Sequence, residues 1–115
     1  MSGVQRILIV EDEPLIAMML EDVLDALGKH HVATCDGVTA ALATIEAEDI
    51  EAAILDVNLS GGEKCWPVAD ALAAKGIPFI LSSGGDETGD GHADRPRLAK
   101  PYTMDGVEKA LAALG

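Results

Sequence analysis

Short apolar runs recur along the chain, and polar or turn-forming residues separate them. Each run is too short for a buried helix and rich in strand-forming residues, which is typical of strands covered on both faces. The second run is weaker than the others, and the fifth is short. The predicted strands are Ile7–Val10, His31–Cys35, Ala52–Leu55, Ile77–Leu81 and Arg97–Ala99.

Between the first strands, apolar residues recur at the three- and four-residue spacing of a helix that packs on one face. The first predicted helix begins at Pro14, because the missing N–H of proline costs nothing in a first turn. It ends at Gly28, a typical helix stop. The second predicted helix covers Val38–Ala47, with Asp36 or Thr39 as its N-cap.

The second half of the chain is less regular. A proline deep inside a helix would cost about 3 kcal/mol, so the third helix is predicted over Pro67–Ala74, closed by Gly76, with Glu63–Trp66 as an extended lead-in. Ser82–Pro96 is rich in glycine and aspartate, and is predicted to be a long polar loop or a frayed helix. An amphipathic helix is predicted from Met104 to Leu114.

Strands that alternate with helices predict an α/β fold with a parallel sheet covered on both faces. Crossovers between parallel strands are right-handed almost without exception, so few topologies remain. The architecture expected is a three-layer, doubly wound, flavodoxin-like sheet of five strands in one domain over residues 1–115.

Composition narrows the function. The formal net charge is −12, with 20 acidic residues against 8 basic ones. This balance argues against nucleic-acid binding and suits the attraction of divalent cations or basic protein surfaces. The two cysteines, Cys35 and Cys65, lack metal-site spacing, and no run approaches the length of a membrane helix. A signal peptide is not expected, because Glu11, Asp12 and Glu13 interrupt the only early apolar run. A cytoplasmic location is expected, without membrane partners.

Chemistry-bearing residues follow the predicted strands. In a parallel sheet the carboxyl ends of all strands lie at one edge, where ligands bind such folds. Two or three carboxylates, a hydroxyl and an ammonium would meet there, which is the set required for phosphoryl transfer to a carboxylate with Mg²⁺ present. These residues are Glu11 and Asp12 after the first strand, Asp56 after the third, Ser82 and Ser83 after the fourth, and Lys100 after the fifth.

The order VED…LD…S…KP resembles the receiver domain of bacterial two-component response regulators over essentially the whole chain. The resemblance implies the strand order 2-1-3-4-5, which the chemotaxis member of this fold exemplifies. The segments NLSGGE, PVADAL and PFILSSGG are similar to those of stand-alone alphaproteobacterial receivers whose fourth strand reads PFxFATGY.

The resemblance also implies residue roles. Asp56 corresponds to the phosphoacceptor, Asp12 to the direct Mg²⁺ ligand, and Glu11 to an acid that acts through water. The main-chain carbonyl of Asn58 would be a further metal ligand. Ser83 corresponds to the switch hydroxyl, and Lys100 corresponds to the lysine that contacts phosphate.

Some positions depart from the family pattern. Ser60 replaces the usual proline after the phosphoacceptor, which predicts a looser loop. Arg97 replaces the usual aromatic switch residue. The family's coupling between the switch hydroxyl and this aromatic residue is therefore expected to be absent or rebuilt. Ser82 is interpreted as a turn residue that forms a hydrogen bond with the backbone. Trp66 is expected to pack over the phosphoacceptor loop, with a partner-anchoring role as the alternative.

These features predict a single-domain response regulator, a phosphoacceptor protein and not an enzyme, with at most slow Mg²⁺-dependent self-phosphorylation from small donors and autodephosphorylation. A histidine kinase or histidine phosphotransferase would phosphorylate Asp56, and the chain would act as a phosphorelay shuttle or bind an unidentified target protein, as a monomer or weak dimer. One alternative is a phosphorylation-independent pseudo-receiver. Another is a phosphatase, but such enzymes usually need an acid where this chain has Asn58.

Overall fold

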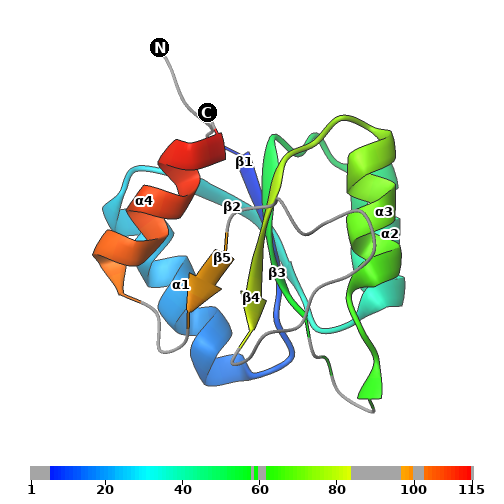
Figure 1. Ribbon diagram of the computed structural model, residues 1–115, viewed down its shortest axis with the longest axis horizontal. Coiled ribbons are helices and arrows are strands. Elements are labelled where there is room, and N and C mark those ends of the chain that lie inside the picture. Colours follow the sequence, from blue (N-terminus) through cyan, green and yellow to red (C-terminus); the bar gives the residue numbers. More distant parts are fainter. Residues whose placement is uncertain (1–5, 58, 60–61, 84–96, 100–102, 115) are drawn as a thin grey trace.

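The computed structural model describes residues 6–57, 59, 62–83, 97–99 and 103–114 (Figure 1). Strands and helices alternate along these residues. The strands are β1 (Arg6–Val10), β2 (His30–Cys35), β3 (Ala52–Asp56), β4 (Phe79–Ser83) and β5 (Arg97–Ala99). The helices are α1 (Pro14–Ala26), α2 (Val38–Ala47), α3 (Trp66–Ala74) and α4 (Met104–Leu114).

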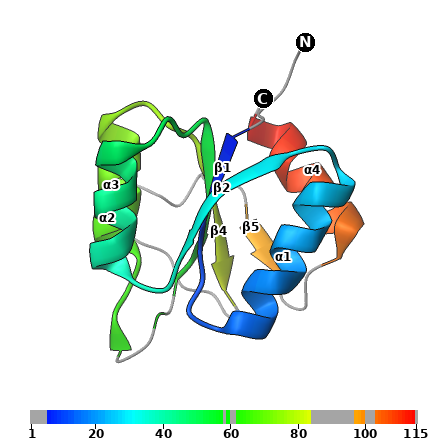
Figure 2. The ribbon, with the colours of Figure 1, turned by 180° about the vertical axis from the view of Figure 1, so that it is seen from behind.

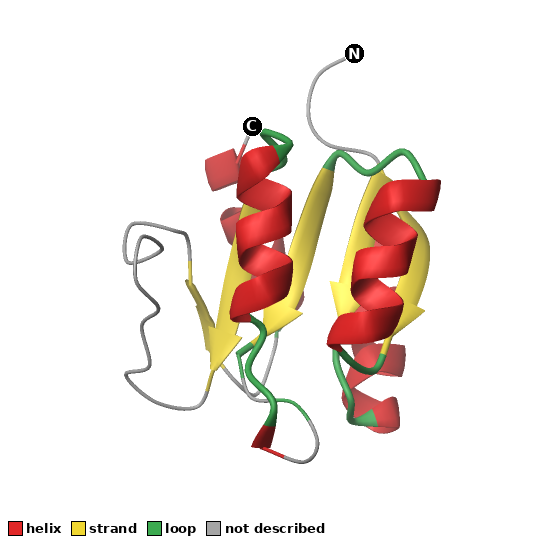
Figure 3. Ribbon diagram, turned by 90° about the vertical axis from the view of Figure 1, so that its right-hand side faces the viewer, coloured by secondary structure: helices red, strands yellow, loops and turns green. Residues whose placement is uncertain are grey.

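The strands form one parallel sheet in the order β2-β1-β3-β4-β5, which confirms the expected fold class and topology. Helices α1 and α4 cover one face of the sheet, and α2 and α3 cover the other (Figures 1 and 2). Figure 3 shows α2 and α3 in front of the sheet, with the arrowheads of the strands all toward one end. None of the described helices is long and apolar enough to cross a membrane.

Alternate residues of the central strands fill two separate cores. Ile7 and Ile9 of β1 pack with α1 and α4, whereas Leu8 and Val10 pack with α2 and α3. All four side chains are fully buried, which explains why the strand reads as a continuous apolar run. The central strands are therefore fixed from both sides, and so are the residues at their ends.

The helix ends at glycine are confirmed. Gly28 and Gly76 have φ values of +76° and +72°, a left-handed conformation that glycine adopts without strain. The N–H of the next residue in each turn donates back into the helix, Lys29 to the Leu24 carbonyl and Ile77 to the Leu72 carbonyl.

Several predicted boundaries shift by one or two residues. Helix α3 begins at Trp66, one residue before Pro67. Strand β4 begins at Phe79 instead of Ile77, because the N–H of Ile77 closes α3 and Pro78 has no N–H for the ladder. The strand also continues through Ser82 to Ser83, so Ser82 belongs to a strand and the turn assigned to it is wrong.

The predicted N-cap of α2 is also wrong. Gly37 occupies the N-cap position in an extended conformation, and no N-cap side chain makes a capping hydrogen bond. The N–H of Val38 instead donates to Oε1 of Glu63, at 3.0 Å. A residue from the loop after β3 therefore does what Asp36 or Thr39 was expected to do.

Candidate functional site

Strand register brings the acidic residues together. Val10 of β1 pairs with Leu55 of β3, so Glu11 and Asp56, the next residue on each strand, reach the same level of the sheet. One carboxylate oxygen from each of Glu11, Asp12 and Asp56 lies within 4.8 Å of the others. We call these three residues the acidic trio. Its formation at the carboxyl edge is as predicted.

Burial makes the acidic trio electrostatically unusual. Glu11 is 3% exposed and Asp56 is 4% exposed, whereas Asp12 is only partly buried. Carboxylates at this separation repel one another, and exclusion of water strengthens the repulsion. A cation with several oxygen ligands relieves this repulsion, and Mg²⁺ prefers carboxylate oxygens. The donor set therefore fits Mg²⁺.

The turn after β1 orients Glu11. Its N–H donates to the Cys35 carbonyl at 2.9 Å, which extends the pairing of β1 with β2 by one residue. Its Oε2 accepts the N–H of Glu13 at 3.2 Å, just before the first turn of α1. Glu13 itself is exposed, occupies the N-cap position of α1 and makes no side-chain cap.

A cavity of about 350 Å³ adjoins the acidic trio, between the ends of β1 and β2 and the first turns of α1 and α2. Glu11, Asp12 and Asp36 line its acidic side, and small apolar side chains such as Ala17 and Ala40 line the rest. Glu11 and Asp12 thus border open space at the edge of the sheet, which gives a hydrated cation a route to the acidic trio.

Ser82 lies beside Asp56 on the neighbouring strand. The two residues are paired in the register of β3 and β4, and Ser82 is fully buried. Its carbonyl accepts the N–H of Val57 at 2.9 Å, so the pairing continues past Asp56. The Ser83 backbone completes β4. The Ser83 side chain, Asn58 and Lys100 lie outside the described residues, as does most of Ser82–Pro96.

The described part of the loop after Asp56 is firmly held. The N–H of Leu59 donates to the Glu63 carbonyl at 2.7 Å, and the N–H of Cys65 donates to the Val57 carbonyl at 3.1 Å. Val57, Leu59 and Cys65 are buried. Ser60, from which a looser loop is predicted, lies outside the described residues.

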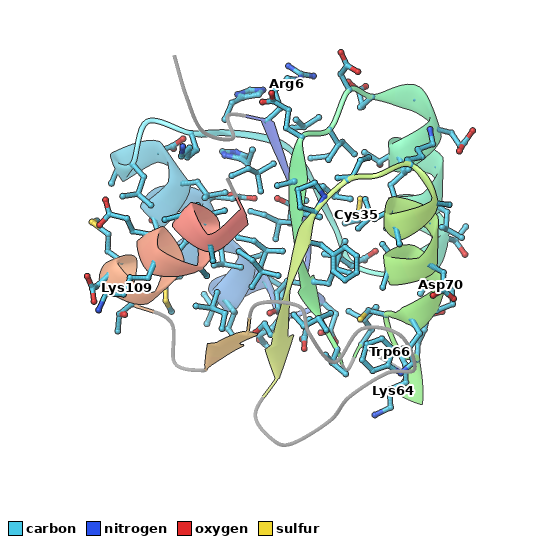
Figure 4. The ribbon with its side chains drawn as sticks, turned by 45° about the horizontal axis from the view of Figure 1, so that its top comes forward. Arg6, Cys35, Lys64, Trp66, Asp70 and Lys109 are labelled. Atoms are coloured by element: carbon cyan, nitrogen blue, oxygen red, sulfur yellow. The ribbon has the colours of Figure 1, made fainter. Side chains whose placement is uncertain are left out.

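Trp66 packs against the core cluster between the sheet and α2 and α3. Its packing over the phosphoacceptor loop stays a prediction. Figure 4 shows Trp66 near Lys64, at the end of the molecule opposite Arg6. The extended lead-in predicted over Glu63–Trp66 is wrong for its last two residues, because Cys65 has helical backbone angles (φ −78°, ψ −1°) and Trp66 is the first residue of α3. Cys35 and Cys65 are both free and buried, as expected of small apolar residues.

The fold and the acidic trio at the carboxyl edge of the sheet are those of a receiver domain. Residues 7–88 match the family model of the response regulator receiver domain, which is more than half of the chain. The chain belongs to this family. Receiver domains are regulatory parts of two-component systems, not catalytic enzymes. They bind Mg²⁺ in their acidic pocket and interact with histidine kinases or phosphotransferases.

Individual relatives match more of the chain than the family model does. The solution structure of SdrG from Sphingomonas melonis Fr1 is 62% identical, with a TM-score of 0.90 over 99% of this chain and 98% of that one. The BeF3-activated conformation of SdrG from Pseudomonas melonis Fr1 is 61% identical, with a TM-score of 0.84 over the same shares.

Among curated proteins, the chain is 32% identical to the transcriptional regulatory protein TcrA of Mycobacterium tuberculosis. That alignment covers 98% of this chain and 46% of TcrA. Identity to the transcriptional activator protein IrlR of Burkholderia pseudomallei is 40%, over 74% of this chain and 37% of IrlR. The chain spans less than half the length of these two relatives.

Proposed function

We propose that this receiver accepts a phosphoryl group on Asp56 from a histidine kinase or histidine phosphotransferase. The added charge then alters its affinity for a target protein. The observation that carries the proposal is the acidic trio itself, with Asp56 buried at the end of a central strand. The acidic trio makes Asp56 the best-placed nucleophile, because Asp56 alone of the three belongs to the central strand β3.

In the proposed reaction, a carboxylate oxygen of Asp56 forms a bond to the phosphorus atom of a phosphohistidine. The phosphorus–nitrogen bond breaks, and its electron pair returns to the imidazole of the donor. Ser83 and Lys100 are proposed to contact the transferred phosphoryl oxygens. The two free cysteines agree with the reducing cytoplasm that this partner class implies.

Asp12 is proposed to hold Mg²⁺ directly and Glu11 to hold it through water, with the Asn58 carbonyl as a further ligand. When bound, Mg²⁺ supplies positive charge that stabilises the phosphoryl oxygens.

The pseudo-receiver is the second candidate, and two observations favour phosphorylation over it. The acidic trio is complete, although an interaction module would not need three clustered carboxylates. The SdrG relative, 61% identical over 99% of this chain, has a BeF3-activated conformation. Beryllofluoride mimics an acyl phosphate, so this activation supports a phosphoacceptor role for the present chain as well.

Treatment of the purified protein with acetyl phosphate and Mg²⁺, followed by mass spectrometry, tests the proposal. One phosphoryl group on the peptide that contains Asp56, lost when EDTA is present, is the expected result. An unmodified protein would support the pseudo-receiver. Return of phosphate from labelled protein to a cognate histidine distinguishes a shuttle from a one-way binder of a target protein.

An exposed apolar patch on α1 is suited to docking of the protein that donates the phosphoryl group. Leu15, Met18 and Met19 are 73%, 57% and 39% exposed, and the patch begins three residues after Asp12. Exposed acids border it, Glu13 before Leu15 and Asp22 after Met19. An apolar surface with an acidic rim fits a donor domain with apolar anchors and a basic rim.

Serine at both Leu15 and Met18 is expected to slow transfer from the histidine donor by about tenfold or more, because apolar anchors dominate such interfaces. Labelling by acetyl phosphate should remain at the native rate, since neither residue belongs to the acidic trio. The matched control replaces Ala73 and Ala74, exposed on α3 across the sheet, with serine. Equal slowing with both phosphoryl donors would contradict a docking role.

A further inference from the structure

Glu63 links the phosphoacceptor loop to a helix that begins elsewhere in the chain. Its side-chain Oε1 accepts the N–H of Val38, the first residue of α2, at 3.0 Å. Its main-chain carbonyl accepts the N–H of Leu59 at 2.7 Å. One residue therefore makes two ties, one to α2 and one back to the loop that follows Asp56.

Helix α2 has no capping side chain at its own N-cap position. The N-cap is Gly37, which has no side chain, and the first turn contains no acidic residue. The first N–H groups of a helix need acceptors, and negative charge is favourable there. Glu63 supplies both from a position 25 residues away in the sequence. Its Oε1 also lies 3.4 Å from the place where a Cβ on Gly37 would stand.

The loop tie encloses the segment predicted to carry a metal ligand. Val57 is held by its N–H, which donates to the Ser82 carbonyl, and Leu59 is held by the Glu63 carbonyl. Asn58 lies between these two buried residues in the sequence. Displacement of Glu63 would therefore release one of the two backbone ties that flank Asn58.

We infer that Glu63 is a positioning residue, which holds the loop after Asp56 against α2 in the conformation required for Mg²⁺ binding. This inference rests on the proposed phosphoacceptor site but assigns a role that the site itself does not require. Glu63 acts through Val38 and Leu59, and it need not touch the metal or the phosphoryl group. The exposed Glu63 carboxylate therefore connects the loop that follows Asp56 to the start of α2.

Glu63→Ala is expected to weaken Mg²⁺ binding about tenfold, the effect typical of residues that orient metal ligands. The melting temperature should fall by about 4 °C through loss of the helix cap. Glu63→Gln, which keeps the acceptor oxygen, should retain most of the Mg²⁺ affinity. Affinity is measured from Trp66 fluorescence and from the rise in melting temperature with Mg²⁺ concentration, so neither readout depends on phosphorylation.

A second variant separates positioning from simple helix stability. Gly37→Ser in the Glu63→Ala background offers α2 a local cap, and the extended backbone at Gly37 accepts any residue. The expected result is recovery of the melting temperature without recovery of Mg²⁺ affinity. Recovery of both, or native affinity in Glu63→Ala, would overturn the inference. A protein whose Mg²⁺ affinity depends on Glu63 but that takes no phosphoryl group would contradict only the proposed function.

Discussion

Asp56→Asn will accept no phosphoryl group from acetyl phosphate, and its metal-free form will be more stable than the native protein. The first effect follows because an amide is not a nucleophile for phosphorus under these conditions. The second follows from the acidic trio, whose carboxylate oxygens lie within 4.8 Å of one another while Asp56 is 4% exposed. Removal of one charge relieves repulsion that Mg²⁺ otherwise screens.

In EDTA the melting temperature of Asp56→Asn is expected to exceed that of the native protein by on the order of 5 °C. Saturating Mg²⁺ should raise the native melting temperature and leave that of the variant nearly unchanged. Mass spectrometry of both proteins after acetyl phosphate treatment measures the label.

Asp36→Asn is the matched control for Asp56→Asn. Asp36 lines the neighbouring cavity but does not belong to the acidic trio, so its variant should keep both the label and the response to Mg²⁺. Label that survives in Asp56→Asn would place the phosphoacceptor elsewhere. A lower melting temperature of that variant in EDTA would show that Asp56 is stabilised by its neighbours despite their charge.

The sheet could be predicted from sequence because the central strands are buried on both faces. Ile7 and Ile9 face one core while Leu8 and Val10 face the other, so β1 appears as an unbroken apolar run between polar turns. The acidic trio could be predicted for a related reason. Parallel strands end at one edge, so residues at the carboxyl ends of β1 and β3 come near one another there, and the register sets how close they lie.

Contacts that depend on distant partners could not be predicted. Local rules favoured Asp36 or Thr39 as the cap of α2, yet the acceptor came from Glu63. No local pattern marks Glu63 for this role, since an exposed acid in a glycine-rich loop is common. A helix start with glycine at the N-cap and no acid in its first turn is the one signal that an outside acceptor is needed.

Strand β4 shows a similar limit. Its apolar run begins at Ile77 in the sequence, but in the structure the N–H of Ile77 donates to the Leu72 carbonyl at the end of α3. At its other end, Ser82 appears polar and turn-like in sequence, and the strand nevertheless continues because Ser82 pairs with Asp56 on β3 and Leu98 on β5. Pairing on both sides outweighs the weak strand propensity of serine.

Asp12→Asn will weaken Mg²⁺ binding far more than Glu11→Gln, although both residues belong to the acidic trio. Oε2 of Glu11 accepts the N–H of Glu13, and glutamine can still accept this bond, so the geometry of the turn survives the change. Both residues border the cavity beside the acidic trio, and Asp12 is the more exposed of the two. These features agree with a direct ligand at Asp12 and a water-mediated one at Glu11.

The expected losses of Mg²⁺ affinity are on the order of 100-fold for Asp12→Asn and about tenfold for Glu11→Gln. Titration of Trp66 fluorescence with Mg²⁺ measures both, and the rate of labelling by acetyl phosphate at fixed Mg²⁺ should fall in the same order. Glu13→Gln, the exposed neighbour outside the acidic trio, provides the baseline. If Glu11→Gln had the larger effect, the buried acid would be the direct ligand, and the roles of Glu11 and Asp12 would be exchanged.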